Sequence, residues 1–175
     1  VTQGENGQAV TNRVNTLGII WKAVEPRDTE NDLQGVAVLN DAFVVTGGKG
    51  TVLTSADGKE WLKYQAPTSG ILTSVESFNN KFLAVGEEGF ILSSPTGSEW
   101  VRHDSRTENW IYRIRAFGSQ VVAVGQAGTI LTSDDGENWV KRVSGTSQWL
   151  NDVARAGSTW IAVGANGTVL TSSDL

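Results

Sequence analysis

A spacing of 39 residues runs through this sequence and constrains its fold more than any other feature. Pairs of glycines recur at this interval, at Gly47 and Gly50, Gly86 and Gly89, Gly125 and Gly128, and Gly164 and Gly167. A tryptophan keeps the same interval at Trp61, Trp100 and Trp139, and an apolar residue does so at Leu33, Leu72, Ile111 and Leu150. A fixed period of this length indicates tandem copies of one supersecondary unit.

Each copy divides into short segments with the composition of β-strands. The second segment is an uninterrupted run of apolar residues, at 43–45, 82–85, 121–124 and 160–163. Such a run is typical of a strand that is buried on both faces. The glycine pair that follows predicts a hairpin, because glycine adopts positive φ at no steric cost. No segment has a sustained helical period, so we predict an all-β fold.

Four antiparallel strands in each copy, repeated in tandem, are typical of the blades of a β-propeller. A β-solenoid is the alternative, but its coils are usually shorter and need no hairpin at the glycine pair. We therefore predict one propeller domain of about four blades over residues 1–175. Its parts are full blades at 33–71, 72–110 and 111–149, a blade lacking its fourth strand at 150–175, and a degenerate partial blade with a closing strand at 1–32.

The segment WKAV at 21–24 resembles a fourth strand without a blade. Trp21 precedes Leu33 by 12 residues, and Trp61 precedes Leu72 by 11. If this strand completes the last blade, the ring closes with four blades and no open edge. Otherwise the blades belong to a larger ring, or another chain completes the open edge and strand exchange builds an assembly. The sequence leaves these alternatives open.

Composition excludes several classes of partner and chemistry. The net charge of −5 comes without a basic run, so nucleic acid is not an expected partner. No stretch approaches the roughly 20 apolar residues of a membrane span. The absence of cysteine removes disulfides, thiolate metal sites and cysteine nucleophiles together. The chain starts at Val1 without a signal-like segment, which fits a processed secreted form or a piece of a longer protein.

The string TSDDGENW at 132–139 resembles the BNR, or Asp-box, repeats of sialidases, xyloglucan-cleaving glycosidases and sortilin-type receptors. The longer unit VAVGQAGTILTSDDGENW is similar to the photosystem II assembly-factor-like propellers of bacterial secreted proteins. The resemblance extends over nearly the whole chain from Leu33 on. It implies a propeller fold and an extracellular or periplasmic location, and for function it implies little, because propellers host many unrelated activities.

The Asp-box form places Thr132, Asp134, Gly136 and Trp139 at its defining positions, and the other copies depart from it. That drift favours a role in a turn, where short polar side chains accept backbone N–H bonds. Calcium binding by Asp134 and Asp135 is the alternative. Two adjacent acids do not supply the six or more oxygens that calcium takes, so we predict no metal site and no cofactor.

Residues that differ between copies are the candidates for a binding site. The innermost strands carry Glu76, Arg113, Arg115, Asp152 and Arg155 where the first copy has small or apolar residues. Arginines on adjacent blades would make a site for an acidic or carboxylate-bearing partner, unless these charges pair with one another. Trp110 and Trp149 occupy connections between blades, in register with Asp32 and Ile71. Exposed indoles there would bind a partner by stacking, and the alternative is packing between blades.

These observations favour a non-catalytic propeller that presents one face to a protein or glycan partner. A glycoside hydrolase of Asp-box type, or a fragment of one, is the alternative. It needs two carboxylates across a sugar ring, and the sialidase pattern adds an arginine cluster and a tyrosine, for which Tyr64 and Tyr112 are available. No catalytic residue is predicted. A third hypothesis is a strand-exchanging subunit of an extracellular assembly, which self-associates through open blade edges.

Overall fold

The computed structural model describes residues 21, 23–24 and 29–174. Within this part the chain forms four antiparallel sheets, three with four strands and one with three. The strands of each sheet are paired in chain order, so every sheet is a simple meander. The predicted all-β fold of propeller blades is therefore confirmed.

The strand bounds follow the repeat. Blade 1 contains β1 Leu33–Leu39, β2 Ala42–Gly47, β3 Thr51–Ser55 and β4 Leu62–Gln65. Blade 2 contains β5 Leu72–Phe78, β6 Lys81–Gly86, β7 Ile91–Ser94 and β8 Val101–His103. Blade 3 contains β9 Ile111–Phe117, β10 Gln120–Gly125, β11 Ile130–Ser133 and β12 Val140–Arg142. Blade 4 contains β13 Leu150–Ala156, β14 Thr159–Gly164 and β15 Val169–Ser172.

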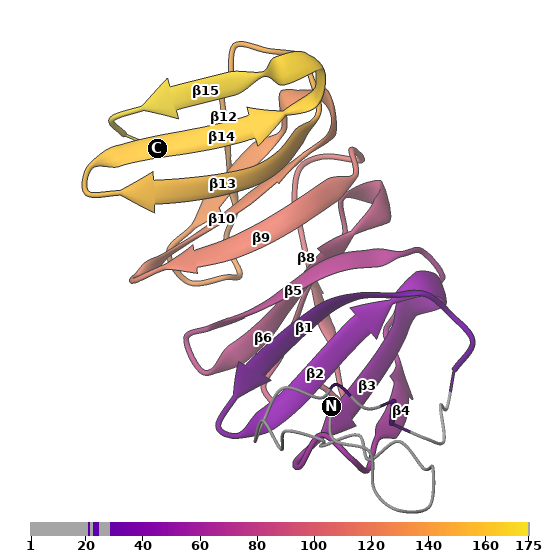
Figure 1. The fold of residues 1–175 in the computed structure, drawn as a ribbon. Helices are drawn as coiled ribbons and strands as arrows, with labels where there is room; N and C mark the ends of the chain where they lie inside the picture. Colours follow the sequence, from indigo (N-terminus) through magenta and orange to yellow (C-terminus); the bar gives the residue numbers. More distant parts are fainter. Residues whose placement is uncertain (1–20, 22, 25–28, 175) are drawn as a thin grey trace, which may run out of the picture.

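The four blades follow one another in an arc. Contacts join their first strands in chain order, β1 with β5, β5 with β9 and β9 with β13. Figure 1 shows blade 1 at one end of this arc and blade 4 at the other, with blades 2 and 3 between them. Blades 2 and 3 are therefore covered on both faces, whereas blades 1 and 4 each have one neighbour in the described part of the chain.

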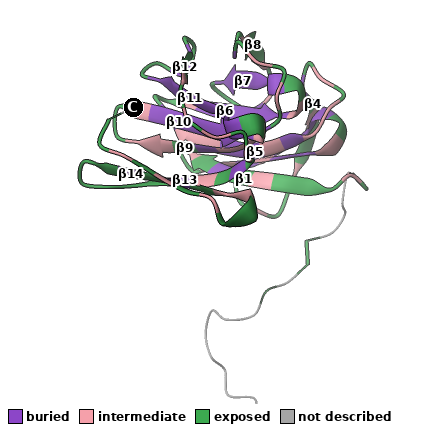
Figure 2. Ribbon diagram, turned by 90° about the horizontal axis from the view of Figure 1, so that it is seen from above, coloured by how far each residue is buried: buried purple, intermediate pink, exposed green. Residues whose placement is uncertain are grey.

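The core consists of three apolar layers, one between each pair of consecutive blades. In β6 and β10 every residue after the first is buried, which confirms the prediction of a strand covered on both faces. In β14 buried and exposed residues alternate instead, because only one face of blade 4 is covered. In Figure 2, β6, β7 and β10 are mostly purple, the colour of buried residues, whereas β14 is largely green, the colour of exposed residues.

The first glycine of each pair is required by a close approach of two backbones. Gly86 has extended backbone dihedrals, but a Cβ there would lie 2.0 Å from the carbonyl oxygen of Ile71. The same carbonyl accepts a hydrogen bond of 3.0 Å from the amide of Glu87. This contact attaches the hairpin of the blade to the connection that enters its innermost strand.

The second glycine of each pair lies in the turn of the hairpin. Glu88 and Gly89 have φ values of 53° and 65°, and the amide of Phe90 donates to the carbonyl of Glu87. Two successive positive φ values define the type I′ turn, which matches the twist of the flanking strands. The predicted hairpin at the glycine pair is confirmed, and the same turn recurs in the four blades at η1 Gly48–Gly50, η2 Glu87–Gly89, η3 Gln126–Gly128 and η4 Ala165–Gly167.

The Asp-box turn is present, but its register differs from the prediction by one residue. The Ser133 hydroxyl accepts the amide of Gly136 at 2.8 Å, and the Asp135 carboxylate accepts the amides of Glu137 and Asn138 at 2.8 Å each. The predicted Thr132 and Asp134 take no part in these bonds. In the corrected register the first two copies agree with the third, with side chains in the same roles at Ser55 and Asp57 and at Ser94 and Thr96. In the last copy the Ser172 hydroxyl accepts the amide of Asp174 at 3.2 Å, as the Ser133 hydroxyl accepts that of Asp135 at 3.3 Å.

Of the predicted closing strand at 21–24, the structure describes three residues. Trp21, Ala23 and Val24 belong to no strand, and the Trp21 side chain is fully exposed. The sheet of blade 4 has three strands in the described residues. The remainder of the partial blade expected at 1–32, namely residues 1–20, 22 and 25–28, lies outside the described residues.

The glycine contact generates a stability prediction. We expect Gly86→Ala to lower the free energy of unfolding by about 3 kcal/mol, because its Cβ would overlap a backbone oxygen that cannot move without breaking a hydrogen bond. Gly118→Ala is the control, since Gly118 also lies in a hairpin but its added Cβ meets nothing within 4 Å. Its positive φ alone costs about 1 kcal/mol. Urea denaturation measures both, and equal losses would contradict the contact.

The Asp135 turn generates a pH prediction. The side chain of Asn138 and two backbone amides hold the pKa of Asp135 well below its ordinary value of 3.8. Its stabilising contribution is therefore complete above that ordinary value and is lost as pH falls through the lower folded-state pKa. We expect Asp135→Asn to be less stable than the native chain at pH 7, with a difference that shrinks below about pH 4.

The control for this measurement is Asp134→Asn at the neighbouring position. The Asp134 carboxylate accepts a hydrogen bond from the side chain of Gln120 at 3.2 Å. We expect this variant to change stability much less at neutral pH. Thermal unfolding followed by circular dichroism between pH 2 and pH 7 distinguishes the two variants. A difference for Asp135→Asn that stays constant over this range would contradict the role of its ionised form.

Candidate functional site

Three aromatic side chains form a continuous row across blades 3 and 4, which we call the aromatic row. The ring centroids of Trp110 and Tyr112 lie 6.3 Å apart, and those of Tyr112 and Trp149 lie 5.8 Å apart. Trp110 is 36% exposed and Trp149 is 50% exposed. The indoles predicted as candidates are thus brought together, and they are not buried between blades.

The repeat scaffold holds both tryptophans in place through their backbones. The carbonyl of Trp110 accepts the amide of Gln126 at 2.8 Å, and the carbonyl of Trp149 accepts the amide of Ala165 at 2.8 Å. A Cβ on Gly125 or Gly164 would lie within 2.0 Å of these carbonyl oxygens. The backbone of each tryptophan is therefore fixed by the same glycine contact that every blade has. The side chain at the tryptophan position differs between blades.

Tyr112 joins the two indoles because of a β-bulge. Ile111 pairs with Gly125 and Arg113 pairs with Val124, so Tyr112 is left without a partner in the ladder. Burial raises the pKa of its phenol above the ordinary value of 10. From the sequence Tyr112 was predicted only as a possible nucleophile, because the bulge that places it between the tryptophans is not apparent in the spacing.

Amide side chains border the aromatic row. The side-chain oxygen of Gln126 lies 3.4 Å from the amide of Trp110, and Asn166 donates to the side-chain oxygen of Gln148 at 2.7 Å. Gln148 directly precedes Trp149, and Asn166 lies at the hairpin tip of the same blade. Aromatic faces for stacking and amides for hydrogen bonding therefore occur together on one part of the surface.

The predicted arginine site is a paired network. Arg115 makes two hydrogen bonds with the carboxylate of Asp152, at 2.6 and 2.7 Å, and the Nε atom of Arg113 lies 4.0 Å from the same carboxylate. The bond from Arg115 lowers the pKa of Asp152, and Asp152 and then Glu76 raise that of Arg115. Arg115 is thus paired with Asp152, as in the alternative in which these charges pair, whereas the Nε atom of Arg113 is buried and has no hydrogen-bond partner among the described residues.

Arg155 has its own partners. Its Nε atom donates to the carbonyl of Gly157 at 2.9 Å, and its guanidinium lies over the ring of Trp160 at 4.9 Å from the centroid. A cation held over an indole with one backbone bond is typical of packing at the edge of a sheet. Arg155 therefore stabilises the β13–β14 hairpin, and the structure does not bring it into the network of Arg113 and Arg115.

One pair of side chains resembles a nucleophile and its base. The Ser93 hydroxyl lies 2.8 Å from the Nε2 atom of His103, but Ser93 is only 6% exposed. Burial lowers the pKa of His103. In the described residues no carboxylate is hydrogen-bonded to the other ring nitrogen, so the orienting third group of a triad is absent from this part of the chain.

The described residues contain no cluster of three or more histidine, cysteine or acidic side chains suited to hold a metal ion. They also contain no helix of sufficient length and apolar character to cross a bilayer.

Comparison with known proteins identifies the fold. No protein-family model and no curated protein matches this sequence. Among solved structures the chain is similar to the computationally designed Ika4 protein, with a TM-score of 0.71 and 16% identity over 88% of this chain and 98% of that one.

Two structures of YCF48 are also similar. One contains YCF48 bound to a D1 peptide, with a TM-score of 0.66 and 21% identity over 83% of this chain and 52% of that one. The other is YCF48 from Cyanidioschyzon merolae, with a TM-score of 0.64 and 20% identity over 84% of this chain and 55% of that one. This chain thus spans about half the length of the YCF48 structures. The resemblance to photosystem II assembly-factor-like propellers is confirmed at the level of the fold.

Proposed function

We propose that this protein is a non-catalytic binding scaffold that captures a peptide segment of another protein on its aromatic row. The observation that carries the proposal is the exposure of Trp110 and Trp149 on either side of Tyr112, on a rigid backbone. Exposed tryptophan and tyrosine side chains are enriched among the residues that contribute most to binding. They also lose little conformational entropy when a partner binds, because few of their torsions are free.

The class of partner follows from the chemistry around the row. Adjacent indole and phenol rings provide faces for proline, aromatic or cationic side chains, and the neighbouring amides provide donors and acceptors for an extended backbone. A similar fold occurs in the structure of YCF48 bound to a D1 peptide, and this supports a peptide partner over a glycan. A sugar ring would use the same stacking faces, so glycan binding is the competing outcome of the test.

The proposal of a non-catalytic role is supported by the lowered pKa of Asp152. The general acid of a glycosidase requires a raised pKa. Asp152 near the axis is instead paired with Arg115, and its pKa is lowered. We also propose an extracellular or periplasmic location, which is supported by the resemblance to propellers of bacterial secreted proteins.

The test is a selection of binders from a random peptide library, run beside a glycan array. We expect the selection to yield peptides that bind the native chain, and we expect Trp110→Ala and Trp149→Ala together to weaken them at least tenfold. Removal of an exposed aromatic residue at the centre of an interface costs about 2 kcal/mol or more. Isothermal titration calorimetry with the selected peptides measures the change.

The matched control is Leu62→Ala, an apolar residue of blade 1 that is 64% exposed and lies outside the aromatic row. It should leave the affinity unchanged. Peptides whose binding survives the double tryptophan variant would contradict the site. Binding of glycans without peptides would replace the proposed partner class, and hydrolysis of a bound glycan would contradict the non-catalytic role.

A further inference from the structure

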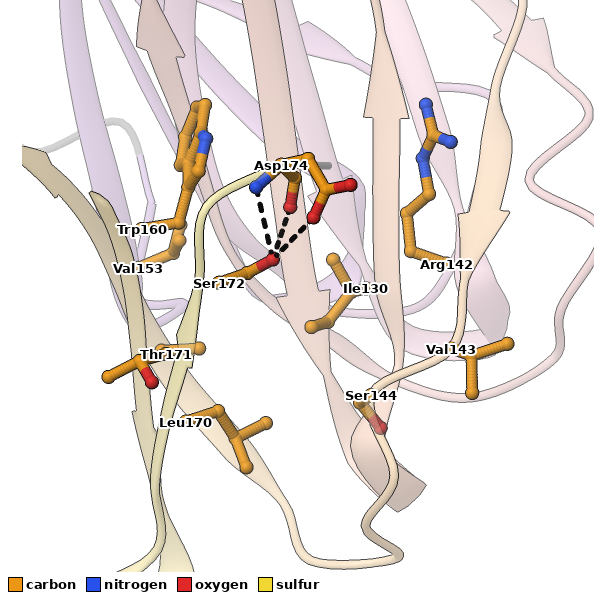
Figure 3. A pocket seen from close by; sticks show the side chains of 11 residues that line it. Ile130, Arg142, Val143, Ser144, Val153, Trp160, Leu170, Thr171, Ser172 and Asp174 are labelled. Carbon is orange, nitrogen blue, oxygen red and sulfur yellow. Dashed lines mark hydrogen bonds between the residues drawn. The ribbon is translucent and has the colours of Figure 1, made fainter. Parts of the chain in front are cut away.

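The aromatic row lies outside the cavity between blades 3 and 4. That cavity measures about 280 Å³, and Figure 3 shows Ile130 and Trp160 on opposite sides of it. None of Trp110, Tyr112 and Trp149 lines it. A ligand of the row therefore lies across exposed rings, and its chemical class follows from the groups that the rings and the nearby backbone leave unbonded.

The backbone beside the row is already hydrogen-bonded at several points. The carbonyls of both tryptophans accept the hairpin amides of their own blades. At the start of β9, the carbonyl of Ile111 accepts the Thr73 hydroxyl at 2.5 Å, and the amide of Ile114 donates to the Ser74 hydroxyl at 3.4 Å. In β13 the amide of Val153 donates to the preceding carboxylate at 2.9 Å. Because strand addition uses the main-chain groups of an open edge, a peptide at the row is recognised by side chains instead.

The side chains of the row carry unused hydrogen-bond donors. Within the described residues, the indole N–H groups of Trp110 and Trp149 and the hydroxyl of Tyr112 have no hydrogen-bond partner. The indole of Trp100, by contrast, donates to the carbonyl of Gly97 at 2.9 Å. An indole N–H group only donates, and a protonated phenol can donate as well. A complementary ligand therefore supplies acceptors beside apolar surface for the rings.

A polyproline II segment meets this requirement better than a helix or a strand. The carbonyls of an α-helix are bonded within the helix, and the amides of a strand need acceptors of their own. Polyproline II has no internal hydrogen bonds, so its carbonyls are free to accept. Proline also has no N–H group that the row would have to satisfy. Aromatic surfaces that bind proline-rich segments use this complementarity.

The length of the row accommodates one turn of polyproline II. Successive ring centroids are 6.3 and 5.8 Å apart, so the two indoles are separated by no more than the sum of these distances. Three residues of polyproline II advance by about 9 Å, and residues three positions apart lie on the same side. Two prolines with this spacing therefore fit on Trp110 and Trp149, with Tyr112 between them.

The charges along β9 disfavour a cationic ligand. Aromatic rings also bind quaternary ammonium groups. Arg113, however, directly follows Tyr112, and its Nε atom has no hydrogen-bond partner among the described residues. The carboxylate of Asp152 is engaged by Arg115. Because like charges repel, a methylated ammonium group is the weaker alternative at this site.

We propose that the segment bound by the aromatic row is proline-rich and adopts the polyproline II conformation. Prolines three positions apart stack on Trp110 and Trp149, and carbonyls of the segment accept hydrogen bonds from the two indoles and from the Tyr112 hydroxyl. This inference rests on the proposed peptide-binding function and specifies its class of ligand.

The first test is calorimetric titration of the 175-residue chain with a peptide of ten prolines. We expect binding, and we expect Trp110→Ala and Trp149→Ala together to weaken it at least tenfold. Tyr112→Phe keeps the ring and removes the donor, so it should weaken binding about threefold or more. The matched control is Tyr64→Phe, the same change at the other tyrosine of the chain, on β4 of blade 1, and it should leave the affinity unchanged.

The second test varies the spacing of the prolines. Two peptides of equal composition carry proline at every third or at every fourth position, and we expect the first to bind at least threefold more tightly, because only its prolines share one side of the polyproline II helix. Equal affinities, or no binding of the ten-proline peptide, would overturn this inference. So would binding of a trimethyllysine peptide in its place.

A library selection distinguishes this failure from failure of the proposed function. Selected peptides that lack proline but need both Trp110 and Trp149 would overturn the polyproline II ligand and leave peptide binding at the row intact. If no selected peptide depends on the two tryptophans, both proposals fail. Proline-rich sequences among the peptides that depend on them are the expected result.

Discussion

The apolar layer between consecutive blades is the interaction on which the rest of this structure depends. A sheet of three or four short strands cannot bury enough apolar surface alone, so each blade is stable only where a neighbour covers it. The central strands β6 and β10 are buried on both faces for this reason. The same requirement explains why the tryptophan of each full blade is retained, since Trp100 and Trp139 extend the layer toward the outer edge.

The repeat separates positions that build the fold from positions that are free to vary. Gly125 and Gly164 are fixed because a carbonyl oxygen occupies the space of a side chain. The residue that supplies this carbonyl is Asp32, Ile71, Trp110 or Trp149 in the four blades, and its side chain is not part of the contact with the glycine. The aromatic row thus occupies a position that is rigid in its backbone and unconstrained in its side chain, which suits a binding surface.

The fold was predictable because its cause is periodic. The 39-residue interval of Gly47, Trp61 and their equivalents indicates a unit that packs against copies of itself, and the same residues recur in each copy. The predicted Asp-box register was wrong because Thr132 and Asp134 have the pattern's spacing to Gly136 and Trp139, whereas the turn is held by the adjacent Ser133 and Asp135. The place of Tyr112 depends on a bulge in the pairing of β9 with β10, and the pairing of Arg115 depends on the approach of Asp152 from another blade. Such contacts have no signal in a single sequence.

The stability of blade 4 affects the aromatic row. Trp149 belongs to the aromatic row, and its backbone is held by the hairpin of a blade that is covered on one face in the described residues. A blade with one covered face opens locally at a lower free energy than a blade covered on both. Any contact that covers Ile161, Val163 and Val169 would therefore also hold Trp149 more firmly beside Tyr112. Because a rigid site loses less entropy on binding, the covering of this face and affinity at the aromatic row are physically coupled.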